Sequence, residues 1–358
     1  MIKFLTKLLI VWLILLVVFG CGPKLKKIDV SDPAVRAERE KQQQLLAENF
    51  LKQQSRLMRI SGPILCSAAE FAPTEKVNAY YGLFFIHKDI ISQEMKNTYV
   101  RMYGLGENPK VLYVAPDSPA EKGGVKNGDE ILKINGKSFN GKEIYKLWAE
   151  ERKKSTTINL TVIREKEVKS VTLNGIPAYS SAVVLSSDQR INAYADGTNV
   201  VVFMGIMNAL SDEEISIIVG HEVAHNLLEH VSKTRGNAAL GTVADVIVSG
   251  LLSFAARTPV STRGAFTNVG ATVYSKEFEG EADYMGLYLS ARAGYDIKQA
   301  ADMWRKMAVL NPGSIKEKSY FSSHPSSPER YLAMEKTIIE IESKCKENKP
   351  LLPDKRSE

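Results

Sequence analysis

The sequence lacks a concentrated stripe of basic residues. Its 47 Lys and Arg residues against 41 Asp and Glu residues give a formal net charge of +6, and this excess is spread along the chain. Proteins that bind nucleic acid usually concentrate positive charge on one stripe, so we expect no nucleic-acid partner. A chain of 358 residues with 44% hydrophobic content is an ordinary globular composition and is long enough for two domains with cores.

The sequence also lacks apolar runs long enough to span a membrane, for which about 20 residues are needed. The run Val243–Phe254 is too short, which favours a buried or partner-facing helix over membrane insertion. The run Leu8–Phe19 follows Lys3 and Lys7 and ends at a small residue, Gly20. A basic start, a short apolar core and a small residue before the cut are typical of a signal peptide.

Cysteine is scarce, with three in the whole chain. The first lies in Val18-Phe19-Gly20-Cys21, which resembles a bacterial lipobox in which Cys21 would be lipidated and become the first mature residue. An uncleaved anchor and plain secretion are the alternatives, and all three place the body of the protein outside the cytoplasm. The remaining Cys66 and Cys345 could form a disulfide in an oxidising compartment, with two free thiols as the alternative.

The sequence contains one HExxH motif, His221-Glu222-Val223-Ala224-His225. Two histidines four residues apart on a helix lie about 40° apart around its axis, so both can reach one ion. Zinc accepts neutral imidazole nitrogens, and the intervening Glu222 can take a proton from water. Ser211 and Glu214 form a capping box that predicts the start of this helix. Because buried histidines and a buried glutamate are costly without a partner, the motif predicts a metal site.

A catalytic zinc site needs a third protein ligand. His230 is a poor candidate because it follows His225 by five residues, which places it about 140° around the helix. The metzincin pattern also fails, because it requires a glycine and a histidine where this chain has Leu228 and Val231. We therefore expect His230 at the helix end or on the surface.

A second helix is predicted by an apolar stripe at helical spacing, formed by Phe278, Ala282, Met285 and Leu289. A neighbouring face carries Glu279, Asp283 and Gly286, whereas Glu277 and Glu281 lie on another face. The small Gly286 would allow another helix to approach closely. Periodicity alone does not choose among the three glutamates.

Residues 80–177 change in character, with short strands separated by turns. The stretch SPAEKGGVKNGDEILKINGK, residues 118–137, closely resembles a PDZ domain of the bacterial protease type and ends in an Asn-Gly hairpin signal. By this resemblance the carboxylate-binding loop, whose backbone amides hold a peptide C-terminus, would be Tyr81, Gly82, Leu83 and Phe84. The segment between this loop and the next strand is longer than a minimal PDZ domain needs. A PDZ domain that serves as a spacer or a lid is the alternative.

The motif HEVAH followed by EGEADYMGL is similar to the zinc metallopeptidase family that includes HtpX, the CAAX prenyl proteases, the Oma-type mitochondrial proteases and the periplasmic protease-chaperone BepA. The resemblance implies that Glu279 is the third zinc ligand. It also implies that Asp283 orients a ligand histidine. One zinc ion per chain would then be held by His221, His225 and Glu279, with a water in the fourth position.

Two further segments carry the same resemblance. INAYADG, residues 191–197, resembles the sheet edge where substrate adds as a strand, which implies substrate contacts at Asn192 and Ala193. HPSSPER, residues 324–330, matches the HP…ER segment of these enzymes. It implies that His324 stabilises the oxyanion and that Arg330 supports the site electrostatically.

The expected fold is α+β, with a mainly helical zincin-type domain, a small sheet and an inserted β-rich PDZ domain. Asp32 and Pro33 predict the start of a long helix that ends near Ile60, before Gly62-Pro63. The expected divisions are a signal peptide (1–20), a tether (21–32), an N-terminal helical part of the peptidase domain (33–79), the PDZ domain (80–177), the peptidase domain (178–346) and a disordered tail (347–358).

These features together predict a zinc-dependent endopeptidase, lipid-anchored in the bacterial cell envelope with its catalytic part in the periplasm. Its substrates would be polypeptides, chiefly misfolded or unassembled envelope proteins, and the PDZ domain would bind substrate C-termini or gate the site. The alternative is an envelope chaperone or assembly factor whose proteolysis is latent. The intact Glu222 argues against a purely structural zinc site, because such a site needs no general base.

Overall fold

A computed structural model of the protein describes residues 28, 30–234, 275–310, 324 and 327–355. The chain divides into two units, residues 1–45 and residues 46–358. In the first unit the described part is chiefly the start of helix α2 (Asp32–Ala68), whose side chains there are almost all exposed. Cys21 and the run Val243–Phe254 lie outside the described residues. Within the described ranges, no helix is both long enough and apolar enough to cross a membrane.

Helix α2 continues beyond its predicted end. The expected stop before Gly62 and Pro63 is wrong, because the helix runs on to Ala68. Gly62 lets the ring of Tyr80 lie directly against the helix, since a Cβ at this position would lie 2.2 Å from the Tyr80 hydroxyl. The extra turn buries three more side chains in the main core, those of Ile64, Leu65 and Ala68. This packing outweighs the missing backbone donor of Pro63.

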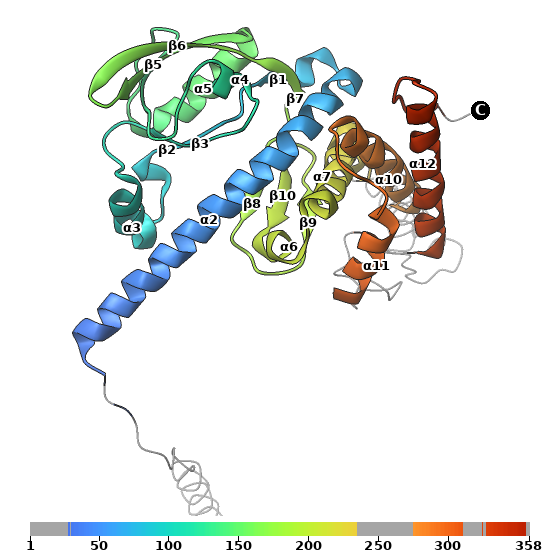
Figure 1. Ribbon diagram of the computed structural model, residues 1–358, viewed down its shortest axis with the longest axis horizontal. Coiled ribbons are helices and arrows are strands. Elements are labelled where there is room, and N and C mark those ends of the chain that lie inside the picture. The colour runs from blue at the N-terminus through green and yellow to red at the C-terminus, as the bar shows by residue number, and fades with distance from the viewer. Residues whose placement is uncertain (1–27, 29, 235–274, 311–323, 325–326, 356–358) are drawn as a thin grey trace, which may run out of the picture. The chain divides into compact units, whose positions relative to one another are not determined.

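Residues 83–174 contain a five-stranded antiparallel sheet in the order β2-β3-β4-β5-β6. Its strands are β2 (Leu83–Ile86), β3 (Lys110–Val114), β4 (Glu130–Ile134), β5 (Thr157–Arg164) and β6 (Glu167–Asn174). The short helix α4 (Pro119–Lys122), η4 (Gly141–Glu143) and helix α5 (Ile144–Lys154) complete the block (Figure 1). Asn135 and Gly136 have φ angles of 49° and 75° between the bridged residues Ile134 and Lys137. Two positive φ angles are the mark of a type I′ turn, so the predicted hairpin is confirmed.

The long segment between β2 and β3 folds as η3 (Lys88–Ile90) and helix α3 (Gln93–Tyr103). A small separate core joins this segment to α2, formed by Ala47, Ile86, Tyr99 and Leu105. The hydroxyl of Tyr103 also donates to the carbonyl of Ala47 at 3.2 Å. The segment that exceeds the predicted PDZ pattern in length therefore forms a helix that packs against α2.

Strands β1 (Val77–Tyr80) and β7 (Ile176–Tyr179) form a separate antiparallel pair, with Val77 opposite Tyr179. They follow η1 (Ala69–Phe71) and η2 (Thr74–Lys76) and flank the β-rich block on both sides in the sequence. The chain therefore enters and leaves this block at neighbouring points, next to the end of α2 (Figure 1).

The rest of the chain combines a small sheet with helices. The sheet order is β8-β10-β9, with β10 (Val200–Phe203) parallel to β8 (Val183–Ser186) and antiparallel to β9 (Ala193–Ala195). The helices are α6 (Met204–Ala209), α7 (Asp212–Leu227), α10 (Ser275–Arg292), α11 (Ala300–Leu310) and α12 (Pro328–Lys346). One core joins this sheet and these helices to the end of α2. The expected α+β class is confirmed.

The segment after α12 is bound to the helices through residue 355. Arg292 donates to the carbonyl of Leu351 at 2.9 Å, and Lys344 donates to that of Leu352 at 2.8 Å. The backbone N–H of Asp354 donates to the hydroxyl of Tyr284 at 3.0 Å. The expectation of a disordered tail is therefore wrong for residues 347–355, because cationic side chains satisfy backbone carbonyls and Leu351 packs against the main core.

Candidate metal centre

Helix α7 carries the HExxH motif in a buried stretch. At its start the hydroxyl of Ser211 accepts from the backbone N–H of Glu214, and the Glu214 carboxylate accepts from that of Ser211 at 2.8 Å. This confirms the predicted capping box. Every residue from Ile215 to Leu227 is buried. His221, Glu222 and His225 therefore lie where water does not offset the cost of their polarity.

Helices α7 and α10 touch through glycines. A Cβ on Gly286 would lie 2.7 Å from the backbone nitrogen of His221, and one on Gly220 would lie 2.6 Å from the carbonyl oxygen of Gly286. The expected close approach of another helix at Gly286 is confirmed. This contact sets the height of α10 against α7 and brings Glu279 and Asp283 beside the histidines.

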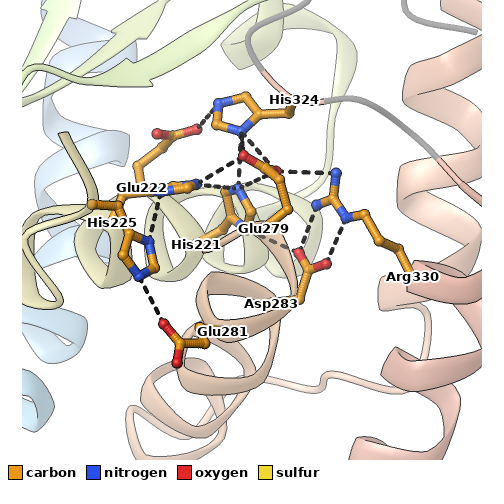
Figure 2. Close-up of polar contacts among 9 residues, drawn as sticks. His221, Glu222, His225, Glu279, Glu281, Asp283, His324 and Arg330 are labelled. Atoms are coloured by element: carbon orange, nitrogen blue, oxygen red, sulfur yellow. Dashed lines mark hydrogen bonds and ion pairs between the residues drawn. The ribbon is translucent and has the colours of Figure 1, made fainter. Parts of the chain in front are cut away.

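Four side chains converge between these helices, each offering one ligand atom within 4.8 Å of the others: His221, His225, Glu279 and His324 (Figure 2). The Nε2 atoms of the two α7 histidines are 3.1 Å apart. The Glu279 carboxylate oxygens lie 3.5 Å from Nε2 of His221 and 3.4 Å from Nε2 of His225. Nδ1 of His324 lies 3.1 Å from Nε2 of His221 and 3.0 Å from Oε2 of Glu279.

This donor set fits a zinc ion. Four ligands about 2 Å from one ion stand about 3.3 Å apart in a tetrahedron, close to the separations of 3.0, 3.1, 3.4 and 3.5 Å found here. Imidazole nitrogens and one carboxylate are ligands that zinc accepts. Beside them, Oε2 of Glu222 is buried and has no hydrogen-bond partner among the described residues. Of the three glutamates left open by periodicity, only Glu279 is buried, whereas Glu277 and Glu281 are exposed.

A buried ion pair supports His221 on the side away from the ligand group. Nδ1 of His221 lies 2.9 Å from Asp283. Two guanidinium nitrogens of Arg330 donate to Asp283 at 2.7 and 2.8 Å, and the third lies 3.1 Å from Glu279. Burial alone would raise the pKa of Asp283, but the charges of Arg330 and His221 lower it, so this carboxylate is ionised. In contrast, Asp283 and Glu279 outweigh burial and raise the pKa of His221.

A different group lies behind His225, and sequence reasoning missed it. Just past the end of α7, Glu229 has a φ of 60°, and this left-handed residue turns the chain so that His230 is only 2% exposed. Nδ1 of His230 lies 3.0 Å from Nδ1 of His225, and its Nε2 lies 3.1 Å from Glu281. Of the two expected positions, the helix end is confirmed and the surface is wrong. A glycine or asparagine usually marks such a turn, and a glutamate gives no such signal.

Burial also affects the charge of this pair. Burial, reinforced by the neighbouring His225, lowers the pKa of His230 to about 3. Burial likewise lowers the pKa of His225, although Glu279 opposes this shift. Both rings are therefore neutral near pH 7, which is the form in which imidazole binds a metal.

His324 stands among the ligand atoms and also faces the proposed base. Its Nε2 lies 3.0 Å from Oε1 of Glu222. Burial opposes protonation of His324, but the carboxylates of Glu279 and Glu222 outweigh burial and raise its pKa well above the ordinary value. Burial would raise the pKa of Glu222, but His324 and the α7 histidines lower it to about 2. An imidazole at this position can act as a fourth ligand or, with its ring turned aside, as a proton donor.

Helix α7 also fixes the small sheet beside the site. Asn226 follows His225 directly, and its side chain accepts from the backbone N–H of Gly197 at 2.8 Å and donates to the carbonyl of Asn199 at 2.9 Å. These two residues lie in the turn between β9 and β10. The edge strand β9 is thereby tied to the helix that carries the motif.

The strand β9 borders a cavity of about 350 Å³ that reaches the ligand group. The strand contributes Tyr194 and Ala195, and the remaining lining includes Glu222, His225, Phe278, Glu279 and His324. Of the expected substrate residues, Ala193 begins this strand and Asn192 directly precedes it. Ala193 is buried opposite Val202, and the carbonyl of Asn192 accepts from Phe203 at 3.1 Å.

The expected carboxylate-binding loop leads into β2, which is an edge strand of the five-stranded sheet. Tyr81 is buried, and Leu83 and Phe84 begin β2. Gly82 has a φ of 71°, and a Cβ there would lie 2.3 Å from the Cβ of Ser118. The loop therefore turns tightly against Ser118 at Gly82, and its binding of a carboxylate stays a prediction.

Aromatic side chains of α5 fill the space beside this loop. The ring of Tyr145 stacks on Phe85 with centroids 5.5 Å apart, and its hydroxyl accepts from the backbone N–H of His87 at 2.9 Å. Trp148 packs against Phe85 at 5.6 Å and against Tyr81 at 5.2 Å. The hydroxyl of Tyr145 therefore takes up the first backbone N–H after β2, and its ring covers Phe85 of that strand.

The two cysteines considered for a disulfide are both free in the structure. Cys66 is half-buried against the main core, and burial raises the pKa of its thiol to about 11. Cys345 is exposed near the end of α12. No bridge joins these two residues.

A model of Peptidase family M48 matches residues 160–338, which is half of the chain and includes every residue of the ligand group. The chain belongs to Peptidase family M48. A PDZ domain model matches residues 91–174 of this M48 protein, within the β-rich block. The expectation of a zinc metallopeptidase family is thereby confirmed at the family level, while the narrower likeness to HtpX, the prenyl proteases or BepA stays a prediction.

Curated relatives of this M48 protein are metalloproteases by name. Mitochondrial metalloendopeptidase OMA1 of Arabidopsis thaliana is 30% identical over 171 residues, which cover 47% of this chain and 34% of that protein. Metalloprotease LoiP of Escherichia coli (strain K12) is 30% identical over 162 residues, covering 44% and 62%. Metalloprotease YcaL of the same bacterium is 31% identical over 163 residues, covering 44% and 61%. The chain thus spans less than two thirds of each of these relatives.

Proposed function

We propose that this M48 protein is a zinc-dependent endopeptidase with one zinc site per chain. His221, His225 and Glu279 would hold the ion, and Glu222 would act as general base. The observation that carries the proposal is the convergence of three imidazole nitrogens and one carboxylate, largely buried, next to a second carboxylate. One oxygen of that second carboxylate has no hydrogen-bond partner among the described residues. A structural site would need no such base.

The residues have separate roles in this proposal. A bound zinc ion would polarise the scissile carbonyl and make a water molecule more acidic. Glu222 would accept the proton of the attacking water and pass it to the leaving amine. His324 would stabilise the oxyanion, for which its ring has to turn out of the ligand group to make room for substrate. Arg330 would stabilise the charge of Glu279 and Asp283.

The substrates would be polypeptides that add to β9 as a further strand. An edge strand offers unpaired backbone groups, so it can bind an extended chain with little dependence on sequence. Ala193 begins the edge strand directly after Asn192, and the next two residues of the strand line the cavity that reaches Glu222. An unfolded segment is the form of polypeptide that such an edge accepts, which supports misfolded or unassembled proteins as the substrate class.

The PDZ domain, residues 80–177, would be an insertion between residues 33–79 and residues 178–346 of the peptidase domain. The β1–β7 pair supports this division. The packing of Tyr145 against β2 favours gating over constant peptide binding. Replacing this ring, as in Tyr145→Ala, should increase the affinity of the full chain for a fluorescent peptide with an apolar free C-terminus. The same peptide with an amidated C-terminus is the control and should gain nothing.

The proposed location is the bacterial envelope, with the body in the periplasm and a lipid on Cys21. The signal-like start and the lipobox-like Gly20-Cys21 support this location. Two of the relatives are Escherichia coli metalloproteases. Metabolic labelling with a palmitate analogue should mark the wild-type chain and leave Cys21→Ser unmarked.

The second candidate function is an envelope chaperone or assembly factor whose proteolysis is latent. One observation favours it: Nδ1 of His324 occupies a ligand position, and its Nε2 faces Glu222. In that arrangement no position is open for water. The cellular role would then survive Glu222→Gln.

Metal analysis paired with casein proteolysis tests both candidates on the full chain in mild detergent. We expect one zinc per chain and cleavage that falls about 100-fold or more in Glu222→Gln, because general-base catalysis is lost. Glu279→Gln should lose both zinc and cleavage. Glu277→Gln, on the exposed face of α10, should match the wild type. Absence of zinc from the wild-type chain would refute the proposal, whereas bound zinc without cleavage would favour the chaperone.

A further inference from the structure

His230 is buried without being part of the HExxH motif or the ligand group. It lies beyond the end of α7 and is 2% exposed. Its ring is stacked on Phe278 of α10, with centroids 4.5 Å apart and an angle of 12° between planes. This stacking fixes the plane of the imidazole, so its two nitrogens point in defined directions. One points toward His225 and the other toward Glu281.

The hydrogen bonds through these rings can run in only one direction if His225 binds a metal. Nε2 of His225 faces the ligand group, so its lone pair must be free for the ion. The proton of the neutral His225 then sits on Nδ1, from which it is donated to Nδ1 of His230 at 3.0 Å. His230 must in turn carry its proton on Nε2, which donates to the Glu281 carboxylate at 3.1 Å.

Each residue in this series of hydrogen bonds therefore determines which nitrogen of the next ring carries the proton. The Glu281 carboxylate only accepts, which selects the Nε2-protonated form of His230. That form presents a lone pair at Nδ1, which selects the Nδ1-protonated form of His225. The selected form is the one whose Nε2 is able to ligate. Both Phe278 and Glu281 come from α10, so the helix that supplies the ligand Glu279 also positions the ring behind His225.

We propose that His230 and Glu281 are positioning residues. They hold the ring of His225 in the orientation and the tautomer that bind a metal. This role rests on the proposed zinc peptidase. It adds to the HExxH motif a series of two hydrogen bonds, from His225 to His230 and from His230 to Glu281, which we call the relay. An ordinary buried histidine would need only partners for its two nitrogens. Here the partners are a ligand histidine and a carboxylate, in the order that metal binding requires.

The test is zinc affinity, measured by competition with a chromophoric chelator on the full chain in mild detergent. His230→Phe keeps the ring stacked on Phe278 but removes the acceptor, and should raise the zinc dissociation constant about 10- to 100-fold. His230→Asn should recover affinity to within about 3-fold of the wild type, because its amide oxygen can stand near the position of Nδ1 and accept the same hydrogen bond. A merely structural role would not be rescued by this smaller side chain.

Glu281→Ala provides a second measurement that does not disturb the core, because its side chain is 55% exposed. It should weaken zinc binding about 3-fold, a small effect because water competes with an exposed carboxylate. The matched control is Glu277→Ala, an exposed glutamate on the same helix, which should leave zinc affinity unchanged. The unfolding temperature of the metal-free protein is measured for each variant, and we expect Glu281→Ala to leave it unchanged.

The outcomes separate the relay from the proposed function. If His230→Phe and Glu281→Ala bind zinc as tightly as the wild type, the relay is refuted, although the peptidase proposal stands. If Glu281→Ala and Glu277→Ala weaken zinc equally, the effect is only one of net charge and the relay is again refuted. If the wild-type chain binds no zinc, the proposed function fails and the relay fails with it. An additional expected sign is a changed visible absorption spectrum of the cobalt-substituted His230→Phe variant.

Discussion

The two histidines of α7 receive different support from the surrounding protein. His221 rests on Asp283, which is buried and held by two hydrogen bonds from the equally buried Arg330. His225 is hydrogen-bonded to the neutral His230, and His230 is hydrogen-bonded to Glu281 at the surface. The support of His221 is therefore a buried ion pair. The support of His225 is a neutral imidazole that is hydrogen-bonded to a solvent-exposed carboxylate.

Substitutions in these two supporting groups should therefore have different effects on stability and on metal binding. Breaking a buried ion pair leaves an uncompensated charge in the core, which destabilises the whole fold. Removing a neutral relay leaves one unpaired N–H, which affects the metal site more than the fold. Substitutions of Asp283 or Arg330 should therefore weaken both the stability of the fold and metal binding. Substitutions of His230 or Glu281 should weaken metal binding and leave the stability of the fold almost unchanged.

The largest effect is expected from Arg330→Met. The change leaves Asp283 and Glu279 without their buried cation, and should lower the free energy of unfolding of the metal-free protein by about 3–5 kcal/mol. Urea unfolding followed by circular dichroism measures this. The matched control is Arg305→Met, because Arg305 pairs with Asp302 and Glu335 at the surface. Exposed pairs contribute about 0–1 kcal/mol, and equal losses in both variants would contradict the buried-pair interpretation.

Gly286→Ala should damage both supports at once. The added Cβ would lie 2.7 Å from the backbone nitrogen of His221, so α10 has to shift together with Glu279, Asp283 and Glu281. Overpacking of this kind costs about 1–3 kcal/mol, and we expect zinc binding to be lost as well. Gly280→Ala is the control on the same helix, because no atom lies within 4 Å of a Cβ built there. Wild-type zinc affinity in Gly286→Ala would show that the helix contact does not set the site.

Asp283→Asn isolates the charge behind His221. The amide keeps an oxygen that can accept from Nδ1 but loses the negative charge that pairs with Arg330. Zinc should bind about 10- to 100-fold more weakly, which corresponds to about 1.4–2.7 kcal/mol. Unlike His230→Phe, this variant should also unfold at a lower temperature after the metal is removed with a chelator. If both variants lose metal-free stability equally, the contrast between the two supports is wrong.

The smallest effect is expected from Glu281→Gln. The amide oxygen can still accept from Nε2 of His230, so only the exposed charge is lost. Zinc affinity should change by less than about 3-fold, because surface charges contribute about 0–1 kcal/mol. Chelator competition at low and high salt measures it, and the small difference from the wild type should shrink as salt rises.

Local sequence patterns predicted the structure correctly where a residue type is strongly tied to one structural role. The capping box of Ser211 and Glu214 fixed the start of α7, and Asn135-Gly136 fixed a type I′ turn. Gly286 predicted a close helix contact because no other residue leaves that space. The HExxH spacing predicted that His221 and His225 face the same point, and their Nε2 atoms are 3.1 Å apart.

Other features depend on packing that no local pattern reports. Pro63 is tolerated inside α2 because three following side chains are buried against distant strands and helices. Glu229 adopts a left-handed conformation that its residue type does not signal, so the burial of His230 just past the helix end was not foreseen. Periodicity left three glutamates open, and the choice of Glu279 needed a family resemblance. The position of His324 among the ligand atoms depends on long-range packing, such as that of α12 against α10.

The pairing of β1 with β7 has a consequence for synthesis of the chain. The buried face of α2 is made early, but the fully buried partners of this face in the main core come from Ala178 and later residues. The five-stranded sheet needs only strands within residues 83–174, so it can form while the later segments are still being translated. Its formation draws β1 and β7 together and closes most of the long loop before the helices assemble, which lowers the entropic barrier to joining α2 with α7 and α10. The five-stranded sheet is thus expected to set the order in which the ribosome-bound chain folds.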